Sequence, residues 1–200
     1  MKLYYAPGAC SMAPHIALNE LGIDHTTEKV DLKSKTTDTG SDFLGVNSKG
    51  YVPTLETNDG TLTEVQVILQ YLADANPAKG LLPKFGDIKR YRAMEMLNFI
   101  SSELHKGIGG LFNPAMPDGG KEAIKGRLDS RLGWMNKQLE KSQYVLGDAF
   151  SVADAYAFTV LGWCKHVGID LGKFPAIGTY LARVAARPAV QKTLQAEGLA

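Results

Sequence analysis

Cysteine is scarce in this chain: only Cys10 and Cys164 occur among its 200 residues. The two lie far apart and form neither a C-x-x-C pair nor a spacing typical of zinc ligands, so we expect no metal site. Because Cys10 has no second cysteine near it, a dithiol oxidoreductase is not expected. Unpaired thiols are typical of proteins in the reducing cytoplasm, which is the location we expect.

A surplus of charge is missing as well, since 22 Lys and Arg balance 21 Asp and Glu to a formal net charge of +1. Without a basic cluster, a nucleic-acid-binding surface is not expected. No apolar run approaches the roughly 20 residues that a membrane span needs. A signal peptide is not expected either, because only three strongly apolar or aromatic residues separate Lys2 from Pro7.

The first part of the chain alternates between strand-like and helix-like segments. Hydrophobic residues make up 44% of the sequence, which is enough for a real core. Residues 58–60, Asn-Asp-Gly, indicate a turn between two strands of a hairpin. The order β-α-β-α-β-β-α predicts an α/β domain across residues 1–76. The expected elements are strands at 3–5, 25–30, 51–56 and 61–62, and helices at 11–21, 37–44 and 65–73.

A linker is predicted across residues 77–86, where two prolines and a glycine fall close together. Beyond it, the helical spacing of apolar residues predicts an all-helical domain across residues 87–200. Ser151 and Asp154 have the spacing of a helix-capping box, which assigns them to folding rather than chemistry. The expected helices are 87–111, 121–141, 152–167 and two shorter ones divided at Arg187-Pro188.

Cys10 is the candidate for chemistry in the first domain. It follows the turn Ala6-Pro7-Gly8-Ala9 and stands where a helix is expected to begin. Unpaired backbone N–H groups and the positive end of the helix dipole both favour a thiolate there. The alternative is a buried structural cysteine, because cysteine also packs as a small hydrophobe. Cys164, in an apolar helix, is expected to be of that second kind.

A small α/β domain with a thiol at its first helix, followed by a helical domain, resembles the cytosolic glutathione transferases. Several motifs make the resemblance specific to the bacterial beta class, and they span essentially the whole chain. Each motif alone is weak, but their order and spacing together are specific. The motifs are Pro7-Gly8-Ala9-Cys10-Ser11, Pro14-His15-Ile16-Ala17-Leu18, Val30-Asp31-Leu32 with Lys35, Tyr51-Val52-Pro53, Leu62-Thr63-Glu64, Asn98-Phe99, Ser102 to Gly107, Ser151 to Asp154, and Ala196-Glu197-Gly198-Leu199.

The resemblance implies a thioredoxin-like first domain that binds the tripeptide glutathione as an added strand. Cys10 would lie beside the glutathione sulfur and could form a mixed disulfide with it. Ser11 would donate a hydrogen bond to the thiolate, cap the helix, or do both. Pro53 would follow a cis peptide bond that turns the Val52 backbone toward the peptide. Lys35 is a further implied glutathione ligand.

Glu64 stands at the start of a helix that would receive the γ-glutamyl group of glutathione. Its carboxylate could accept from the ligand's ammonium, while the helix N-terminus binds the ligand's carboxylate. The alternative is an ordinary helix start with a dipole-favoured acid. Val65 departs from the family, which usually has Gly or Ser here. A backbone N–H contact survives this change, but a serine hydroxyl contact is lost, and a β-branched residue cannot take a positive φ cheaply.

The helix expected from residue 87 carries Asn98, Ser102 and His105 on one stripe beside its core stripe. A solvated polar face is the alternative for such a pattern. The resemblance implies instead that this stripe looks across an interdomain cleft at Cys10. His105 would then donate to the thiolate or serve as an acid–base group.

The resemblance also assigns roles to the neighbours of this stripe. Lys106 would add positive charge to the catalytic group formed by Cys10, Ser11 and His105. Glu103 would reach the ligand of the partner subunit. The implied glutathione contacts in the helical domain are Asn98, Ser102, Glu103, Leu104 and His105.

The sequence therefore predicts a cytoplasmic homodimer that conjugates the glutathione thiolate to electrophilic small molecules in a cleft shared with the helical domain. One alternative is glutathione-dependent disulfide exchange or reductive dehalogenation, in which Cys10 itself attacks the substrate. A second alternative is non-catalytic binding of apolar ligands. Neither nucleic acid nor membrane is an expected partner.

Overall fold

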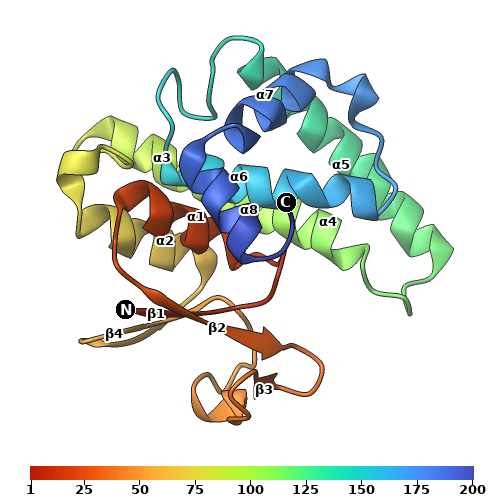
Figure 1. The fold of residues 1–200 in the computed structure, drawn as a ribbon. Coiled ribbons are helices and arrows are strands. Elements are labelled where there is room, and N and C mark those ends of the chain that lie inside the picture. Colours follow the sequence, from red (N-terminus) through yellow and green to blue (C-terminus); the bar gives the residue numbers. More distant parts are fainter. The chain divides into compact units, whose positions relative to one another are not determined.

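The computed structural model describes all 200 residues and contains two compact units. The first comprises residues 1–80 and 187–200, and the second comprises residues 81–186. All strands belong to the first unit, and they take the red and orange part of the colour scale in Figure 1. The division after Gly80 falls inside the predicted linker. None of the helices combines the length and the apolar character that crossing a lipid bilayer requires.

The strands of the first unit form a mixed sheet with the order β3-β2-β1-β4-β5. β1 and β2 are parallel, whereas the other neighbouring pairs are antiparallel. The predicted hairpin joins β4 to β5 and closes with Thr57 opposite Gly60. The strands are β1 (Lys2–Tyr5), β2 (Thr26–Asp31), β3 (Thr36–Thr37), β4 (Thr54–Thr57) and β5 (Gly60–Thr63).

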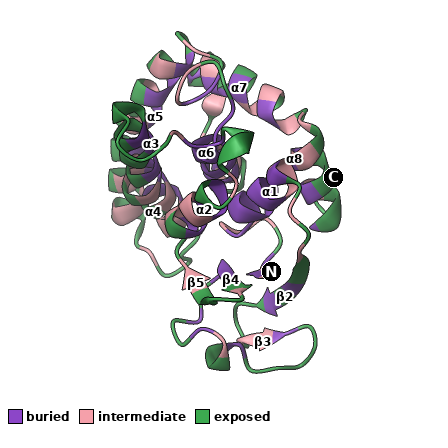
Figure 2. Cartoon of the chain, turned by 90° about the vertical axis from the view of Figure 1, so that its left-hand side faces the viewer, coloured by how far each residue is buried: buried purple, intermediate pink, exposed green.

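Two helices alternate with these strands as predicted, α1 at Met12–Leu21 and α2 at Val65–Asp74. α1 packs against α2 and is buried over most of its length, as its purple ribbon shows (Figure 2). It ends before Gly22, whose φ of 68° lies in the left-handed region that favours glycine at a helix end. The α/β first unit therefore has the thioredoxin-like order of elements, with one exception.

The exception is the helix predicted at residues 37–44, which is wrong. β3 pairs antiparallel with the end of β2, and only a single 3-10 turn, Phe43–Gly45, follows it. β-branched threonines favour the extended backbone of β3. Asp42 then caps the short turn by accepting from Leu44 N at 2.9 Å. The fully buried side chain of Phe43 attaches residues 37–45 to the core. This single aromatic contact takes the place of the apolar helix face that the sequence predicted here.

The last helix, α8 at Pro188–Ala196, belongs to the first unit, whereas the sequence placed the end of the chain in the helical domain. α8 packs against α1. Asn19 Nδ2 donates to Thr193 Oγ1 at 2.9 Å, and Arg187 forms a two-point ion pair with Glu20 at 2.5 and 2.9 Å. These contacts tie the helix to α1 rather than to the helices that precede it in sequence.

Helices make up the regular structure of the second unit. Its α6 is buried almost all round, as its continuous apolar sequence predicts (Figure 2). Two short 3-10 turns, Trp163–His166 and Leu171–Lys173, lead from α6 to α7. The α-helices are α3 (Ile88–Phe99), α4 (Lys106–Gly110), α5 (Asp118–Leu139), α6 (Val152–Gly162) and α7 (Pro175–Ala185).

A π-helical segment, Ile100–His105, interrupts the long helix predicted at residues 87–111. Its i to i+5 hydrogen bonds widen the backbone turn, and such bulges are frequent at functional sites. Ile100, Leu104 and Ile108 stay fully buried and keep the core contact through the bulge. Of the side chains predicted to form a regular polar stripe, Ser102 and His105 therefore lie on the widened turn, whereas Asn98 precedes it in α3.

Asp154 joins three segments of the second unit through its buried carboxylate. It accepts from Ser151 N at 2.8 Å and Ser151 Oγ at 2.7 Å, and the predicted capping box of α6 is present. It also accepts from Val145 N at 2.9 Å and Tyr180 Oη at 3.2 Å. Burial raises the pKa of Asp154 to about 6, and the hydrogen bonds act against that rise.

Replacing Asp154 by alanine should lower the free energy of unfolding by roughly 3 kcal/mol, because buried donors outside α6 lose their acceptor together with the cap. Urea unfolding of the purified variant measures this. Asp148, an exposed acid in the same segment, provides the matched control. We expect Asp148→Ala to change stability little. Equal stability of Asp154→Ala and the wild type would contradict the assignment to folding.

Candidate active site

Cys10 lies in the turn that leads from β1 into α1, as predicted. The turn is tight, since Ala9 N donates to Ala6 O at 3.0 Å and Met12 N donates to Ala9 O at 3.0 Å. Cys10 is partly exposed, and its Sγ donates to Val52 O at 3.2 Å. Cys10 is therefore not buried in the core as a structural cysteine would be.

Cys164 shows the opposite environment. It follows α6, it is fully buried, and burial raises the pKa of its thiol to about 12. A thiol that stays protonated at neutral pH is a poor nucleophile. The two cysteines thus differ in burial, and Cys164 lies in the core as the sequence predicted.

Ser11 is fully buried and its hydroxyl is used within the turn. It accepts from Ala6 N at 3.1 Å and donates to Ala6 O at 3.3 Å. It stands at the N-cap position of α1 without making a side-chain cap hydrogen bond. Because a hydroxyl has a single proton, the Ala6 carbonyl competes with the predicted thiolate for it. In this arrangement Ser11 fixes the shape of the turn that carries Cys10.

The loop before β4 lies beside Cys10 and contains the predicted cis peptide bond between Val52 and Pro53. Lys35 reaches this loop, where its Nζ donates to Gly50 O at 2.9 Å and lies 5.9 Å from the Tyr51 ring centroid. Tyr51 itself is largely exposed. The structure therefore brings four predicted site residues together around one loop: Cys10, Lys35, Val52 and Pro53.

Glu64 stands immediately before α2 with a φ of 71°, a left-handed conformation that is uncommon outside glycine. Residues held in this way cluster at ligand clamps. Its exposed carboxylate lies 2.5 Å from Lys49 Nζ, which also donates to Thr63 Oγ1 at 2.8 Å. Val65 is the first helical residue and is buried. The positive φ is thus at Glu64 and not at Val65, so the backbone strain that a β-branched residue would cause at a positive φ does not arise.

In the second unit, His105 ends the π-helical segment and is held by two aromatic side chains. Its Nδ1 lies 2.6 Å from Tyr156 Oη, and its ring meets the Trp163 ring edge-on at a centroid distance of 4.9 Å. The side chain is partly exposed, and Lys106 next to it is exposed. Sequence reasoning missed both aromatic partners, although Tyr156 places a hydroxyl in an otherwise apolar helix.

The other predicted residues of this segment have local contacts. Ser102 Oγ donates to Asn98 O at 2.9 Å, and both residues are exposed. Glu103 accepts from Arg131 Nε at 2.8 Å in a partly exposed ion pair. Leu104 is fully buried, so only its backbone could contact a ligand.

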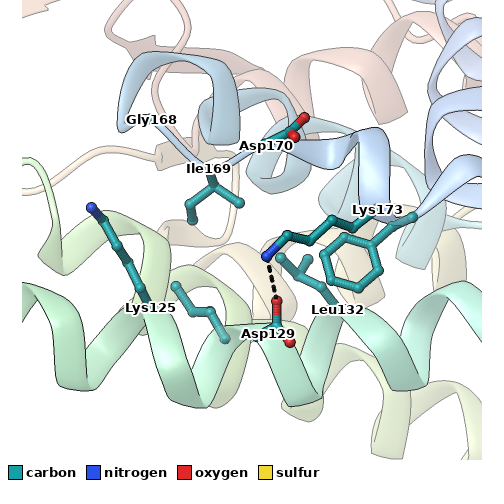
Figure 3. Close-up of a pocket in the computed structure, with 9 residues that line it drawn as sticks. Lys125, Asp129, Leu132, Gly168, Ile169, Asp170 and Lys173 are labelled. Atoms are coloured by element: carbon teal, nitrogen blue, oxygen red, sulfur yellow. Dashed lines mark ion pairs between the residues drawn. The ribbon is translucent and has the colours of Figure 1, made fainter.

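A separate pocket of about 190 Å³ lies in the second unit between α5 and the segment before α7 (Figure 3). Its charged side chains already have partners in the protein, and one ion pair lies within the lining itself. Lys173 Nζ lies 3.7 Å from Asp129 Oδ1, and Asp170 accepts from Gly172 N at 2.8 Å. The lining residues are Lys125, Leu128, Asp129, Leu132, Gly168, Ile169, Asp170, Lys173 and Phe174, and no predicted site residue is among them.

Known proteins match both parts of the chain. Residues 8–75 match the family model of the N-terminal domain of glutathione S-transferase, and residues 99–188 match that of its C-terminal domain. Glutathione S-transferase GstA of Escherichia coli O157:H7 is 46% identical over 200 residues, the full length of both chains.

Solved structures match equally well. A sphingomonad glutathione S-transferase complexed with glutathione is 49% identical, with a TM-score of 0.96 over the full length of both chains. A beta-class glutathione S-transferase of Sphingomonas chungbukensis is 46% identical, also with a TM-score of 0.96 and full coverage of both. The chain belongs to the glutathione S-transferase family and, within it, to the bacterial beta class.

Proposed function

We propose that this transferase conjugates the thiolate of glutathione to electrophilic small molecules. The position of the Cys10 thiol at the start of α1, 3.2 Å from Val52 O, carries the proposal. It joins a helix N-terminus, which favours a sulfur anion, to an extended backbone segment that can pair with a peptide. The glutathione bound to the sphingomonad relative supports the same ligand here.

The hydrogen bond between Cys10 and Val52 links ionisation to peptide binding. A thiol donates only while it keeps its proton, so ionisation of Cys10 ends the bond to the Val52 carbonyl. That carbonyl can then accept from an amide N–H of glutathione bound as an added strand. The site therefore exchanges an internal hydrogen bond for one to the ligand.

The start of α2 would bind the γ-glutamyl end of the peptide. Backbone N–H groups at the helix N-terminus would bind the ligand's carboxylate. Glu64 would accept from the ligand's ammonium, in place of its present ion pair with Lys49. That pair is exposed, and exposed pairs contribute only about 0–1 kcal/mol, so exchanging the partner costs little. Lys35, at the loop around Val52, would add a positive charge for another carboxylate of glutathione.

The second unit would contribute an acid–base group and the electrophile site. We assign the first role to His105, because Tyr156 and Trp163 hold its ring in one orientation. When Tyr156 donates to Nδ1, the neutral ring carries its proton on Nε2, which can then donate to a sulfur anion. Lys106 would add positive charge. The proposed glutathione contacts of this unit are Asn98, Ser102, Glu103, Leu104 and His105.

Thiol–disulfide exchange through Cys10 is a second candidate, favoured by the partial exposure of that thiol. The Cys10 thiolate would attack a disulfide, form a mixed disulfide and release one thiolate. A glutathione thiolate would then attack the mixed disulfide, restore the Cys10 thiolate and leave with the bound sulfur as a new disulfide. A cytoplasmic location fits both candidates, because neither cysteine is in a disulfide.

One variant separates the two candidates. In Cys10→Ala, conjugation should stay within roughly tenfold of the wild type, since losing one neighbouring hydrogen-bonding group costs about 1 kcal/mol. Glutathione-dependent disulfide exchange should vanish, because alanine cannot form a mixed disulfide. Steady-state rates with an aromatic halide electrophile and with a small mixed disulfide measure the two activities.

Mass spectrometry of the wild type after glutathione disulfide treatment gives an independent readout. We expect a reducible glutathione adduct on Cys10 and none on Cys164, whose buried thiol serves as the internal control. Loss of both activities in Cys10→Ala would make Cys10 the essential nucleophile and would contradict the conjugation mechanism proposed above.

His105 should matter for turnover more than for folding. Removing an acid–base group typically costs at least about 10²-fold, so kcat of His105→Ala should fall by that amount while its melting temperature changes little. Tyr156→Phe keeps the ring and removes the hydroxyl at Nδ1, and its kcat should be intermediate. The exposed His166 gives the control variant His166→Ala. Unchanged kinetics of His105→Ala would place this histidine on an ordinary solvated surface.

We also propose that the chain forms a homodimer. Ile88, Tyr91 and Met94 recur at spacing three on α3, which places them on one side of the helix, and Phe85 precedes them. All four are exposed, Phe85 and Ile88 to 69% and 66%. Exposed apolar patches of this kind mark protein–protein interfaces.

Light scattering should therefore give twice the 21.6 kDa mass of the chain. The double variant Ile88→Glu/Tyr91→Glu should give the mass of one chain, because two charges would be buried without partners in the interface. Leu32→Glu introduces a charge at an exposed apolar residue of the other unit and should remain a dimer. A monomeric wild type would refute the proposal.

A further inference from the structure

Glu197, near the end of the chain, has a fully buried carboxylate that the proposed reaction does not use. Its Oε1 accepts from His15 Nδ1 at 2.8 Å, and its Oε2 accepts from Gly8 N at 2.9 Å. A buried carboxylate is costly unless hydrogen bonds satisfy its oxygens, and here both oxygens have a partner. Those partners lie on either side of Cys10: Gly8 in the turn before it, and His15 in the helix after it.

The local sequence fixes where the Glu197 side chain begins. Gly198 has a φ of 71°, and its N donates to Gln195 O at 3.1 Å. Leu199 N donates to Leu194 O at 2.8 Å. This pair of hydrogen bonds is the Schellman motif that ends α8, with glycine in the left-handed position. Glu197 is thus held at a defined helix end rather than on a loose tail.

The same tail covers the turn. Gly8 has a φ of 68°, and a Cβ placed on it would lie 3.6 Å from Leu199 Cδ1. The segment 197–199 therefore contacts the turn in two ways, through a hydrogen bond to the Gly8 backbone and through an apolar side chain over it.

We propose that Glu197 is a positioning residue for Cys10. One carboxylate joins the turn and the helix that flank the thiol. It holds Gly8, two residues before Cys10, at a fixed distance from α1. The hydrogen bonds from Ala9 to Ala6 and from Met12 to Ala9 carry this constraint to Cys10. The thiol is kept against the α1 N-terminus, where its thiolate is favoured. The inference deepens the proposed function and concerns the same site.

The test measures the reactivity of Cys10 without glutathione, by its rate of alkylation with iodoacetamide at pH 7. Buried Cys164 contributes no signal, since burial raises the pKa of its thiol to about 12. In Glu197→Ala the rate should fall by about tenfold, the change in thiolate fraction for one pKa unit. The kcat/KM for glutathione-dependent disulfide exchange, in which Cys10 is the attacking group, should fall by roughly 10- to 100-fold, the cost of a misplaced reacting group, mainly through kcat. Conjugation should stay within about tenfold of the wild type, as in Cys10→Ala.

Two further variants separate positioning from stability. Glu197→Gln keeps the shape of the side chain: its amide oxygen can accept from Gly8 N, and its NH₂ can donate to Nδ1 of a neutral His15. This variant should restore most of the alkylation rate. Arg187→Gln removes the ion pair with Glu20 that docks α8. It should lower the melting temperature and leave the alkylation rate unchanged.

The inference would be overturned if Cys10 in Glu197→Ala were alkylated at the wild-type rate. It would also be overturned if Arg187→Gln slowed the alkylation as much as Glu197→Ala does. If Glu197→Ala does not fold, hydrogen exchange of the Gly8 amide in the wild type decides: slow exchange, as in the core of α1, supports the constraint, and exchange at the rate of a loop refutes it. If the alkylation results hold while the wild type conjugates no electrophile, the proposed function fails and the positioning role stands.

Discussion

Burial of α1 is the constraint on which the rest of the first unit depends. This helix packs against α2 and against α8, and almost every one of its side chains leaves water. Because the helix cannot shift without exposing that surface, its N-terminus is a fixed point in the unit. The fixed position of the α1 N-terminus also holds the turn that precedes it, together with Cys10 and Ser11. A reactive thiol gains from such a setting, since the dipole and the N–H groups that favour its anion stay aligned with it.

Each unit uses one buried carboxylate at a helix end to join segments that are distant in sequence. Asp154 lies in the first turn of α6 and accepts hydrogen bonds from Val145 N and Tyr180 Oη. Glu197 ends α8 and binds His15 and Gly8. In both, two or more hydrogen bonds act against desolvation of the charge, so losing the carboxylate leaves several donors unsatisfied at once. Each acid lies beside a helix-capping motif, which fixes the backbone from which its side chain extends. The carboxylate can therefore reach only a few positions, and this explains how it meets partners that are distant in sequence.

The sequence was informative wherever a local rule decides the structure. The turn and helix around Cys10, the hairpin over residues 58–60 and the box formed by Ser151 and Asp154 each depend on neighbours in the chain, and each is present. Residues 37–44 were misassigned because pairing of β3 with β2 is a tertiary contact that overrides helical spacing. The π-helical segment left no trace in the pattern, since Ile100, Leu104 and Ile108 keep a helical spacing of four. The orientation of His105 at the end of this segment depends on contacts with Tyr156 and Trp163. Both lie more than fifty residues away in the sequence, so the local periodicity could not predict these contacts.

The return of α8 to the first unit makes the second unit an insertion within the first. His15 and Glu197 are 182 residues apart, yet they are in direct contact. Contacts of such separation close large loops and slow folding. During synthesis, the face of α1 that α8 covers must stay exposed until the whole helical unit has left the ribosome, and the Glu197 carboxylate emerges only after that unit. The unit that contains Cys10 is therefore completed only after the inserted helical unit has been made, which delays the final shape of the turn around the thiol.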